Sequence, residues 1–150
     1  MDASIAYTHI ACFIDGSDAA ERGLAHAIAM RALSEGRLSV VHVVASPTFL
    51  VSIAASIGGA PVHDTNVERE AAQMWLEEQT RDLEGAAAVL LEGHPASTAC
   101  DWARETACDL MVAATHRGLV DRSLLGSFAS HVAHHAPCPV LLVPPSDGAS

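Results

Sequence analysis

The segment from Leu110 to Phe128 combines the residue types that bind a phosphate group. An apolar run, Leu110–Ala114, is typical of a buried strand, and Gly126-Ser127 lies at or within the start of a helix. The polar loop between them carries Arg117, Gly118 and Arg122. A strand end, a glycine-containing loop and a helix N-terminus together direct backbone N–H groups and the helix dipole at an anion. Two of the eight basic residues of a chain with formal net charge −10 lie here, so the spacing predicts a phosphate cradle.

The composition excludes several kinds of chemistry. A length of 150 residues predicts one domain, residues 1–150, and half of the residues are apolar, which is enough for a sizeable core. The acidic balance argues against nucleic acid as a partner, because eight cations cannot assemble a basic face. All eight are arginines. The lack of lysine excludes a Walker A lysine, a Schiff base and a lysine general base.

The cysteines and the N-terminal sequence predict a cytoplasmic protein. None of the four cysteines forms a C-x-x-C pair, so we expect reduced and mostly buried thiols in a reducing compartment. Residues 1–13 show neither a basic n-region nor a long apolar run. We therefore expect no signal peptide, no membrane span and no membrane partner.

Apolar periodicity predicts five strands that alternate with four helices. The strands are expected at residues 8–14, 38–44, 86–91, 110–114 and 139–143. The helices are expected from Asp18 to a stop at Gly36, at 65–83, at about 96–107, and over a segment with Leu125, Phe128, Val132 and Ala136 on one face. Asp18-x-x-Glu21 and Thr65-x-x-Glu68 have the spacing of capping boxes.

Two segments are less regular. Residues 45–63 mix apolar residues with glycine and proline and could hold a short helical piece. This excursion either covers a ligand or a partner subunit, or it is a loosely packed connection. Residues 146–150 are expected to form a frayed tail.

The βαβαβαβαβ order predicts an α/β fold with a doubly wound, mostly parallel five-stranded sheet and helices on both faces. If the strand order is 3-2-1-4-5, the switch point lies between the first and fourth strands, and ligands bind beyond the carboxyl ends there. The loops that leave these two strands are Asp15-Gly16-Ser17 and residues 114–118. The first offers a carboxylate to ribose or adenine and the second leads into the phosphate cradle, so the topology predicts a nucleotide-like anion.

Five stretches of the sequence resemble the universal stress protein family. They are DGS at 15–17, VVHVV at 40–44, EGHP at 92–95, ACDLMVAATHRG at 107–118 and GSFASHVAHHAPCPVLLV at 126–143. Together they extend over nearly the whole chain. The resemblance implies a Rossmann-like five-stranded sheet, a homodimer and, in one subgroup of the family, the binding of ATP, with Mg²⁺ or Mn²⁺ accompanying the phosphates.

The sequence departs from the ATP motif of that subgroup, G-x2-G-x9-G-[ST]. Aligned through Thr115-His116, the first two glycines become Ala114 and Arg117, and eight residues separate Arg117 from Gly126. Aligned on Gly118, the first position becomes Thr115 and seven residues remain. Gly126-Ser127 matches in both alignments. Either Gly118 and the arginines form a phosphate site in a shortened loop, or the site binds an altered ligand or none.

The resemblance also implies roles for individual residues. Asp15, in the turn with Gly16 and Ser17, would accept hydrogen bonds from the sugar or the base, and Val43 would offer backbone groups and an apolar wall to adenine. Thr115, Arg117 and Gly118, which follow Ala114, would approach the ribose and phosphates. Gly126, Ser127 and the N–H group of Phe128 would bind the outer phosphates. The alternatives are a helix cap for Ser127 and a strand-end cap for Asp15.

Several other residues invite a functional interpretation that we do not adopt. His42, within the second strand, is expected to be a satisfied imidazole, buried or half-buried, with a functional base as the alternative, and Trp75 is expected in the core. His131 and His135 share a helix face and Cys138 lies nearby, which would suit a metal ion. Because HHAPCP resembles the helix-to-strand junction of the family, we predict no metal site there.

Three functions compete. The first is a nucleotide-binding regulatory protein of the stress response that is not an enzyme, although weak ATPase activity stays open; no G-x-S-x-G elbow or paired carboxylates suggest a hydrolase. The second is a nucleotide-independent interaction module that acts as a homodimer, paired through the apolar edge strand at 139–143. The third, a phospho-receiver domain, is disfavoured because such domains need a lysine after the fifth strand.

Overall fold

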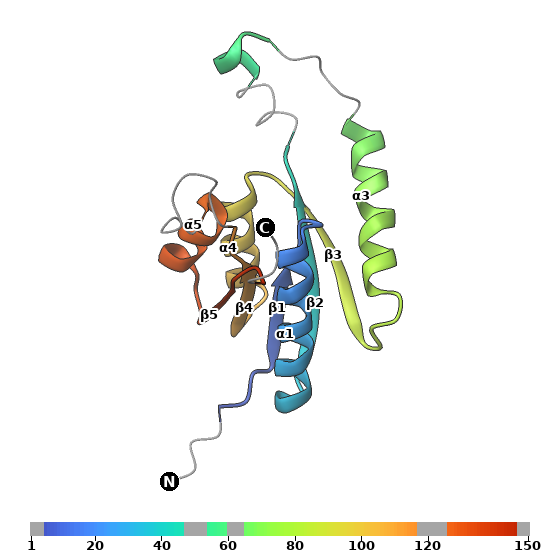
Figure 1. The fold of residues 1–150 in the computed structure, drawn as a ribbon, viewed down its shortest axis with the longest axis vertical. Coiled ribbons are helices and arrows are strands. Elements are labelled where there is room, and N and C mark those ends of the chain that lie inside the picture. The colour runs from blue at the N-terminus through green and yellow to red at the C-terminus, as the bar shows by residue number, and fades with distance from the viewer. Residues whose placement is uncertain (1–4, 47–53, 60–64, 117–125, 147–150) are drawn as a thin grey trace.

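The computed structural model describes residues 5–46, 54–59, 65–116 and 126–146. In this part of the chain five parallel strands form one sheet in the order β3-β2-β1-β4-β5 (Figure 1). The strands are β1 (His9–Phe13), β2 (Arg37–Val44), β3 (Ala86–Glu92), β4 (Leu110–Ala114) and β5 (Val140–Val143). The predicted doubly wound sheet and its order 3-2-1-4-5 are confirmed.

The four long helices are α1 (Asp18–Ser34), α3 (Thr65–Thr80), α4 (Pro95–Glu105) and α5 (Ser127–His135). The strand side chains divide between two cores by alternation. Ile10 and Cys12 of β1 pack on the side of α1 and α3, whereas Ala11 and Phe13 pack on the side of α4 and α5. The central strands are buried on both faces, which explains their continuous apolar sequences and confirms helices on both faces of the sheet.

α1 begins at Asp18, as predicted, but its capping residue differs from the prediction. Ser17 is the N-cap, and its Oγ accepts a hydrogen bond of 3.1 Å from the Ala20 N–H. The expected cap, Asp18, is therefore the first helical residue, and the predicted box with Glu21 is wrong. Ser17 and Asp18 are both suitable capping residues. Ser17 takes the extended conformation that a cap needs, and its hydroxyl reaches the N–H of Ala20, the third residue of the helix.

The end of α1 differs from the prediction. Glu35, with φ of 54°, takes the left-handed conformation that ends the helix, one residue before the expected stop at Gly36. Gly36 is needed for another reason, because a Cβ there would collide with the carbonyl oxygen of Tyr7 and lie 3.2 Å from the Thr8 carbonyl. The glycine lets the chain enter β2 directly beside the segment that enters β1.

The remaining boundaries shift modestly. α3 ends at Thr80 rather than Leu83, and its predicted cap, Thr65, is the first helical residue. α4 begins at Pro95, one residue before the expected start, and ends at Glu105, two residues before the expected end. Residues 54–57 are helical, as expected of a short piece in 45–63. Leu125, most of 45–63 and residues 147–150 lie outside the described residues.

The cysteines match the prediction of buried, reduced thiols. All four are free, and three of them, Cys12, Cys100 and Cys108, are buried. Burial raises the pKa of the Cys12 and Cys108 thiols to about 12. Within the residues that the structure describes, no helix is long and apolar enough to cross a bilayer.

Candidate functional site

A cavity of about 480 Å³ lies at the carboxyl ends of β1, β2 and β4, bounded by the N-termini of α4 and α5. This is the switch point, where the chain goes from β1 to β2 on one side and to β4 on the other. Six residues predicted for the site line the cavity: Asp15, Val43, Ala114, Gly126, Ser127 and Phe128. The structure therefore brings Asp15 of the first predicted loop and Ala114 of the second to one cavity.

The other predicted residues fall elsewhere. Gly16 and Ser17 line a separate hollow of about 60 Å³ between the start of α1 and Trp75 of α3. The Thr115 N–H donates to the Val143 carbonyl at 2.9 Å, so Thr115 extends the pairing of β4 with β5 and is not among the lining residues. Arg117 and Gly118, with Arg122, lie outside the described residues.

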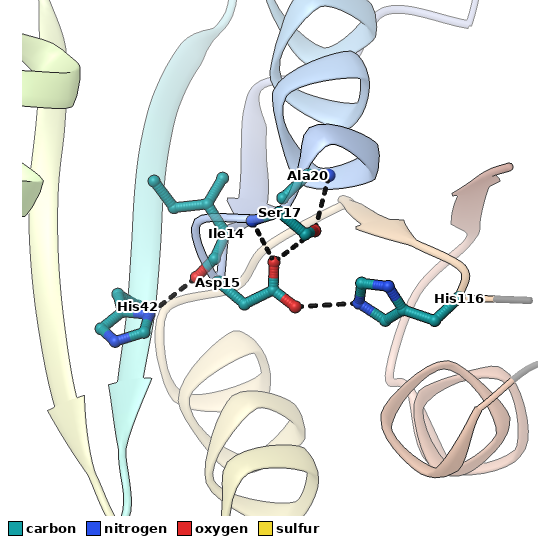
Figure 2. A network of polar contacts seen from close by, with 6 residues as sticks. All are labelled: Ile14, Asp15, Ser17, Ala20, His42 and His116. Carbon is teal, nitrogen blue, oxygen red and sulfur yellow. Dashed lines mark hydrogen bonds and ion pairs between the residues drawn. The ribbon is translucent and has the colours of Figure 1, made fainter. Parts of the chain in front are cut away.

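Asp15 connects the two sides of the cavity (Figure 2). Its Oδ1 accepts from the Ser17 N–H at 3.0 Å and from the Ser17 hydroxyl at 2.6 Å, and its Oδ2 lies 2.9 Å from Nε2 of His116. Burial opposes ionisation of this carboxyl, but the hydrogen bonds from Ser17 and His116 outweigh it and hold the pKa of Asp15 below its ordinary value. Asp15 therefore caps the end of β1 with one oxygen and turns the other toward the end of β4.

His116 is a site residue that the sequence analysis missed. It follows β4 by two residues and lies in the cavity wall together with Ala114. Side chains two positions apart on an extended chain lie on the same side. The predicted site position of Ala114 could therefore have indicated His116 as a second lining residue. The contact was predicted instead for Thr115, which lies between them in the sequence.

The floor of the cavity is apolar. Phe13 and Phe128 come from β1 and α5, with ring centres 5.9 Å apart, and Val41 and Pro95 also line the cavity. Of these four residues only Phe128 was predicted. Phe13 and Val41 lie in buried strands, where the sequence does not distinguish a core position from one that lines a cavity. Such a surface suits the face of an aromatic base.

His42 lies beside this floor and is satisfied, as predicted. Its Nδ1 is 2.7 Å from the carbonyl oxygen of Ile14 (Figure 2), and its ring meets Trp75 edge to face at 5.0 Å. The half-buried Trp75 packs against the core, which confirms its predicted position. Together these contacts fix the segment that leaves β1.

The N-terminus of α5 faces the cavity with backbone donors. Gly126 is the N-cap, with φ of 78°, and makes no side-chain capping bond. Its carbonyl accepts the first bond of the helix, from the Ser130 N–H at 3.0 Å. The N–H groups of the first helical residues, Ser127, Phe128 and Ala129, have no acceptor within a helix. The alternative role of Ser127 as the helix cap is wrong, because Gly126 holds that position.

Electrostatics at this end favour an anion. The positive end of the α5 dipole and the first N–H groups meet the cavity where Gly126 and Ser127 are exposed. A Cβ on Gly126 would have nothing within 4 Å, so the space beside the backbone is open. Among the described residues, no group of three or more His, Cys, Asp or Glu side chains could hold a metal ion.

Comparisons with known proteins identify the family. Several solved structures share the fold, among them two with a bound nucleotide. One is a universal stress protein in complex with cAMP, 22% identical, with a TM-score of 0.67 over 95% of this chain and 100% of that one. The other is a universal stress protein family protein from Arabidopsis thaliana with AMP bound, 16% identical, with a TM-score of 0.63 over 94% of each chain. Identities this low show the fold alone.

A universal stress protein of Methanothermobacter thermautotrophicus is 45% identical over 56 residues. That stretch spans 37% of this chain and 38% of the length of that relative. The model of the universal stress protein family, in contrast, matches residues 6–144, which include every strand and every lining residue of the cavity. The chain therefore belongs to the universal stress protein family.

Proposed function

We propose that this chain is a regulatory protein that binds an adenine nucleotide, ATP, in the cavity at the switch point. The observation that carries the proposal is that three kinds of group line one cavity. They are the carboxylate of Asp15, an apolar surface that includes Phe13, and the first N–H groups of α5. These groups match the ribose hydroxyls, the base and the phosphates of a nucleotide.

Each part of the ligand has a matching group. The Asp15 carboxylate accepts from ribose hydroxyls, and Val43 and Phe13 contact the base. The first N–H groups of α5 bind phosphate oxygens. The cavity of about 480 Å³ lies in the size range of small-molecule sites. Relatives with cAMP and AMP bound support the nucleotide class, and the choice of ATP rests on Gly126-Ser127 and the arginines that follow β4.

The proposed role is regulation through binding, with slow turnover or none. Magnesium or manganese would reach the site on the phosphates of the nucleotide. Ala114 replaces a motif glycine at the cavity wall, where its small side chain leaves room for the ligand.

Isothermal titration calorimetry with ATP and Mg²⁺, ADP, AMP and cAMP tests this function. We expect micromolar binding of ATP by the parent chain and its loss in Gly126→Asp, which places a negative charge beside the phosphates. Gly85→Asp is the matched control: Gly85 also has positive φ, 72°, but precedes β3 at the opposite end of the sheet. No heat from the parent with any of the nucleotides would contradict the proposal.

A second function is favoured by the edge of the sheet. β5 is last in the strand order, so one of its sides has no neighbouring strand in the described residues. The carbonyls of Pro139 and Val143 accept from the Met111 and Thr115 N–H groups toward β4. The alternation of a parallel ladder then turns the N–H and C=O groups of Val140 and Leu142 outward. We propose that a second copy pairs there, which would form a homodimeric interaction module with or without nucleotide.

A further inference from the structure

Two imidazoles lie one turn apart on α5. The ring centres of His131 and His135 are 4.4 Å apart, and the planes are inclined by 40°. His135 is exposed and His131 is half-buried, so both can be reached from solvent. The sequence already placed both histidines on one helix face, and the motif was interpreted as a helix-to-strand junction; the structure adds the short distance between the two rings.

This ring spacing suits a shared metal ion. Residues four apart on a helix are neighbours, and two histidines at that spacing form a recurrent zinc-binding pair. An imidazole nitrogen binds such an ion at about 2.0–2.1 Å, which places the centres of two rings on adjacent coordination positions roughly 4.5–5 Å apart. The observed 4.4 Å is close to that range without any movement of the backbone.

We propose that His131 and His135 chelate one divalent transition-metal ion of the class that imidazole prefers, Zn²⁺, Ni²⁺ or Cu²⁺. Water completes the coordination. The formal net charge of −10 attracts cations to the protein as a whole. This site is separate from the nucleotide cavity and does not depend on the proposed function.

The neighbouring histidines limit the site to two protein ligands. The ring of His94 is 6.3 Å from that of His131, and its Nδ1 is 3.2 Å from the Ser97 hydroxyl. The ring of His134 is 6.5 Å from that of His135, and its Nδ1 is 2.7 Å from the Ser130 carbonyl. This agrees with the finding that no group of three or more donors in the described part of the chain could hold a metal ion.

The test is titration of tag-free protein with Zn²⁺ and with Ni²⁺, followed by calorimetry. We expect one ion per chain with micromolar affinity. His131→Gln and His135→Gln should each lower the affinity at least about tenfold, since each removes one of two ligands. Circular dichroism checks that both variants keep the fold.

His134→Gln is the matched control, because it makes the same substitution on the same helix without removing a proposed ligand. It should leave the affinity within about twofold, and so should His94→Gln. The chelate is overturned if the parent binds neither ion at millimolar concentration, or if His131→Gln and His135→Gln bind like the parent. An equal loss in His134→Gln or His94→Gln would overturn the assignment to the pair.

Discussion

Oδ2 of Asp15 lies 2.9 Å from Nε2 of His116, which joins the ends of β1 and β4 across the mouth of the cavity. Both side chains are about half exposed, at 53% and 52%, so the net energy of the pair is small. Its main effect is on position. The pair holds one carboxylate oxygen toward the end of β4, while Ser17 holds the other in the turn.

Asp15→Asn should make the protein less stable at neutral pH and less sensitive to acid. The pKa of Asp15 is lowered in the folded state, so its contribution is present above the unfolded pKa of about 3.9 and is lost as pH falls through the folded value. Because the side chain is half exposed, we expect a loss of at most about 1 kcal/mol at pH 7. Urea unfolding at pH 7 and pH 3 measures this difference.

Two variants calibrate that result. Asp101→Asn removes an exposed carboxylate that pairs with Arg104 within α4, and should change stability by less than about 0.5 kcal/mol. His116→Gln should have an equally small effect, since it leaves the bonds from Ser17 in place. A larger loss in either control than in Asp15→Asn would show that the turn is not held by this carboxylate.

Because of His9, the free energy of unfolding should decrease as the pH drops below neutrality. It is buried, with Nε2 2.9 Å from the Ser39 hydroxyl and Nδ1 3.1 Å from the Arg37 guanidinium. Burial lowers the pKa of His9 and the charge of Arg37 adds to this effect; together they outweigh the hydrogen bond to the Thr106 carbonyl and the charge of Asp109, which raise it. Stability from the neutral ring is therefore fully present above the unfolded pKa of about 6.5 and is lost as pH falls through the lower folded value.

The measurement is the free energy of unfolding between pH 7.5 and pH 5.5. The parent should lose stability over this window, and His9→Gln should show a flatter dependence. His26→Gln is the control, because His26 is exposed on α1 and bonds the Arg22 carbonyl of its own helix. Equal slopes for the parent and His9→Gln would refute the assignment.

Gly36→Ala should be destabilising by about 1–3 kcal/mol, because its Cβ would be forced against the Tyr7 and Thr8 backbone rather than against a movable side chain. Glu35→Gly should have the opposite sign, raising stability by up to about 1 kcal/mol, since Glu35 holds the left-handed conformation at φ of 54°. Thermal and urea unfolding distinguish these adjacent substitutions. A harmless Gly36→Ala would show that the approach of the two segments is not tight.

Leu142→Pro should convert the proposed dimer into monomers. It removes an outward N–H group of β5 and leaves the bonds to β4, and proline is tolerated on edge strands. Leu142→Ala is the control, since it keeps the N–H group and should stay dimeric. Light scattering or analytical ultracentrifugation reports the mass. A Leu142→Pro variant that remains a dimer would place the contact elsewhere.

The sequence by itself determined the sheet and predicted the edge of the sheet at which the cavity lies. Continuous apolar runs are required of strands buried on both faces, and each alternates with a helix long enough to cross over, so few topologies remain. Strand boundaries were accurate to within one or two residues, and Leu110–Ala114 was predicted without error. These features are local, so periodicity and turn residues report them directly.

Only the tertiary structure decided which side chains meet. Asp15 and His116 are 101 positions apart, and nothing in either loop shows that they are in contact. The need for Gly36 comes from Tyr7 on a neighbouring segment, and the alternative cap role of Ser127 failed because Gly126 took that position. Local propensity specifies the elements, whereas contacts between distant segments depend on register and packing, which a single sequence does not display.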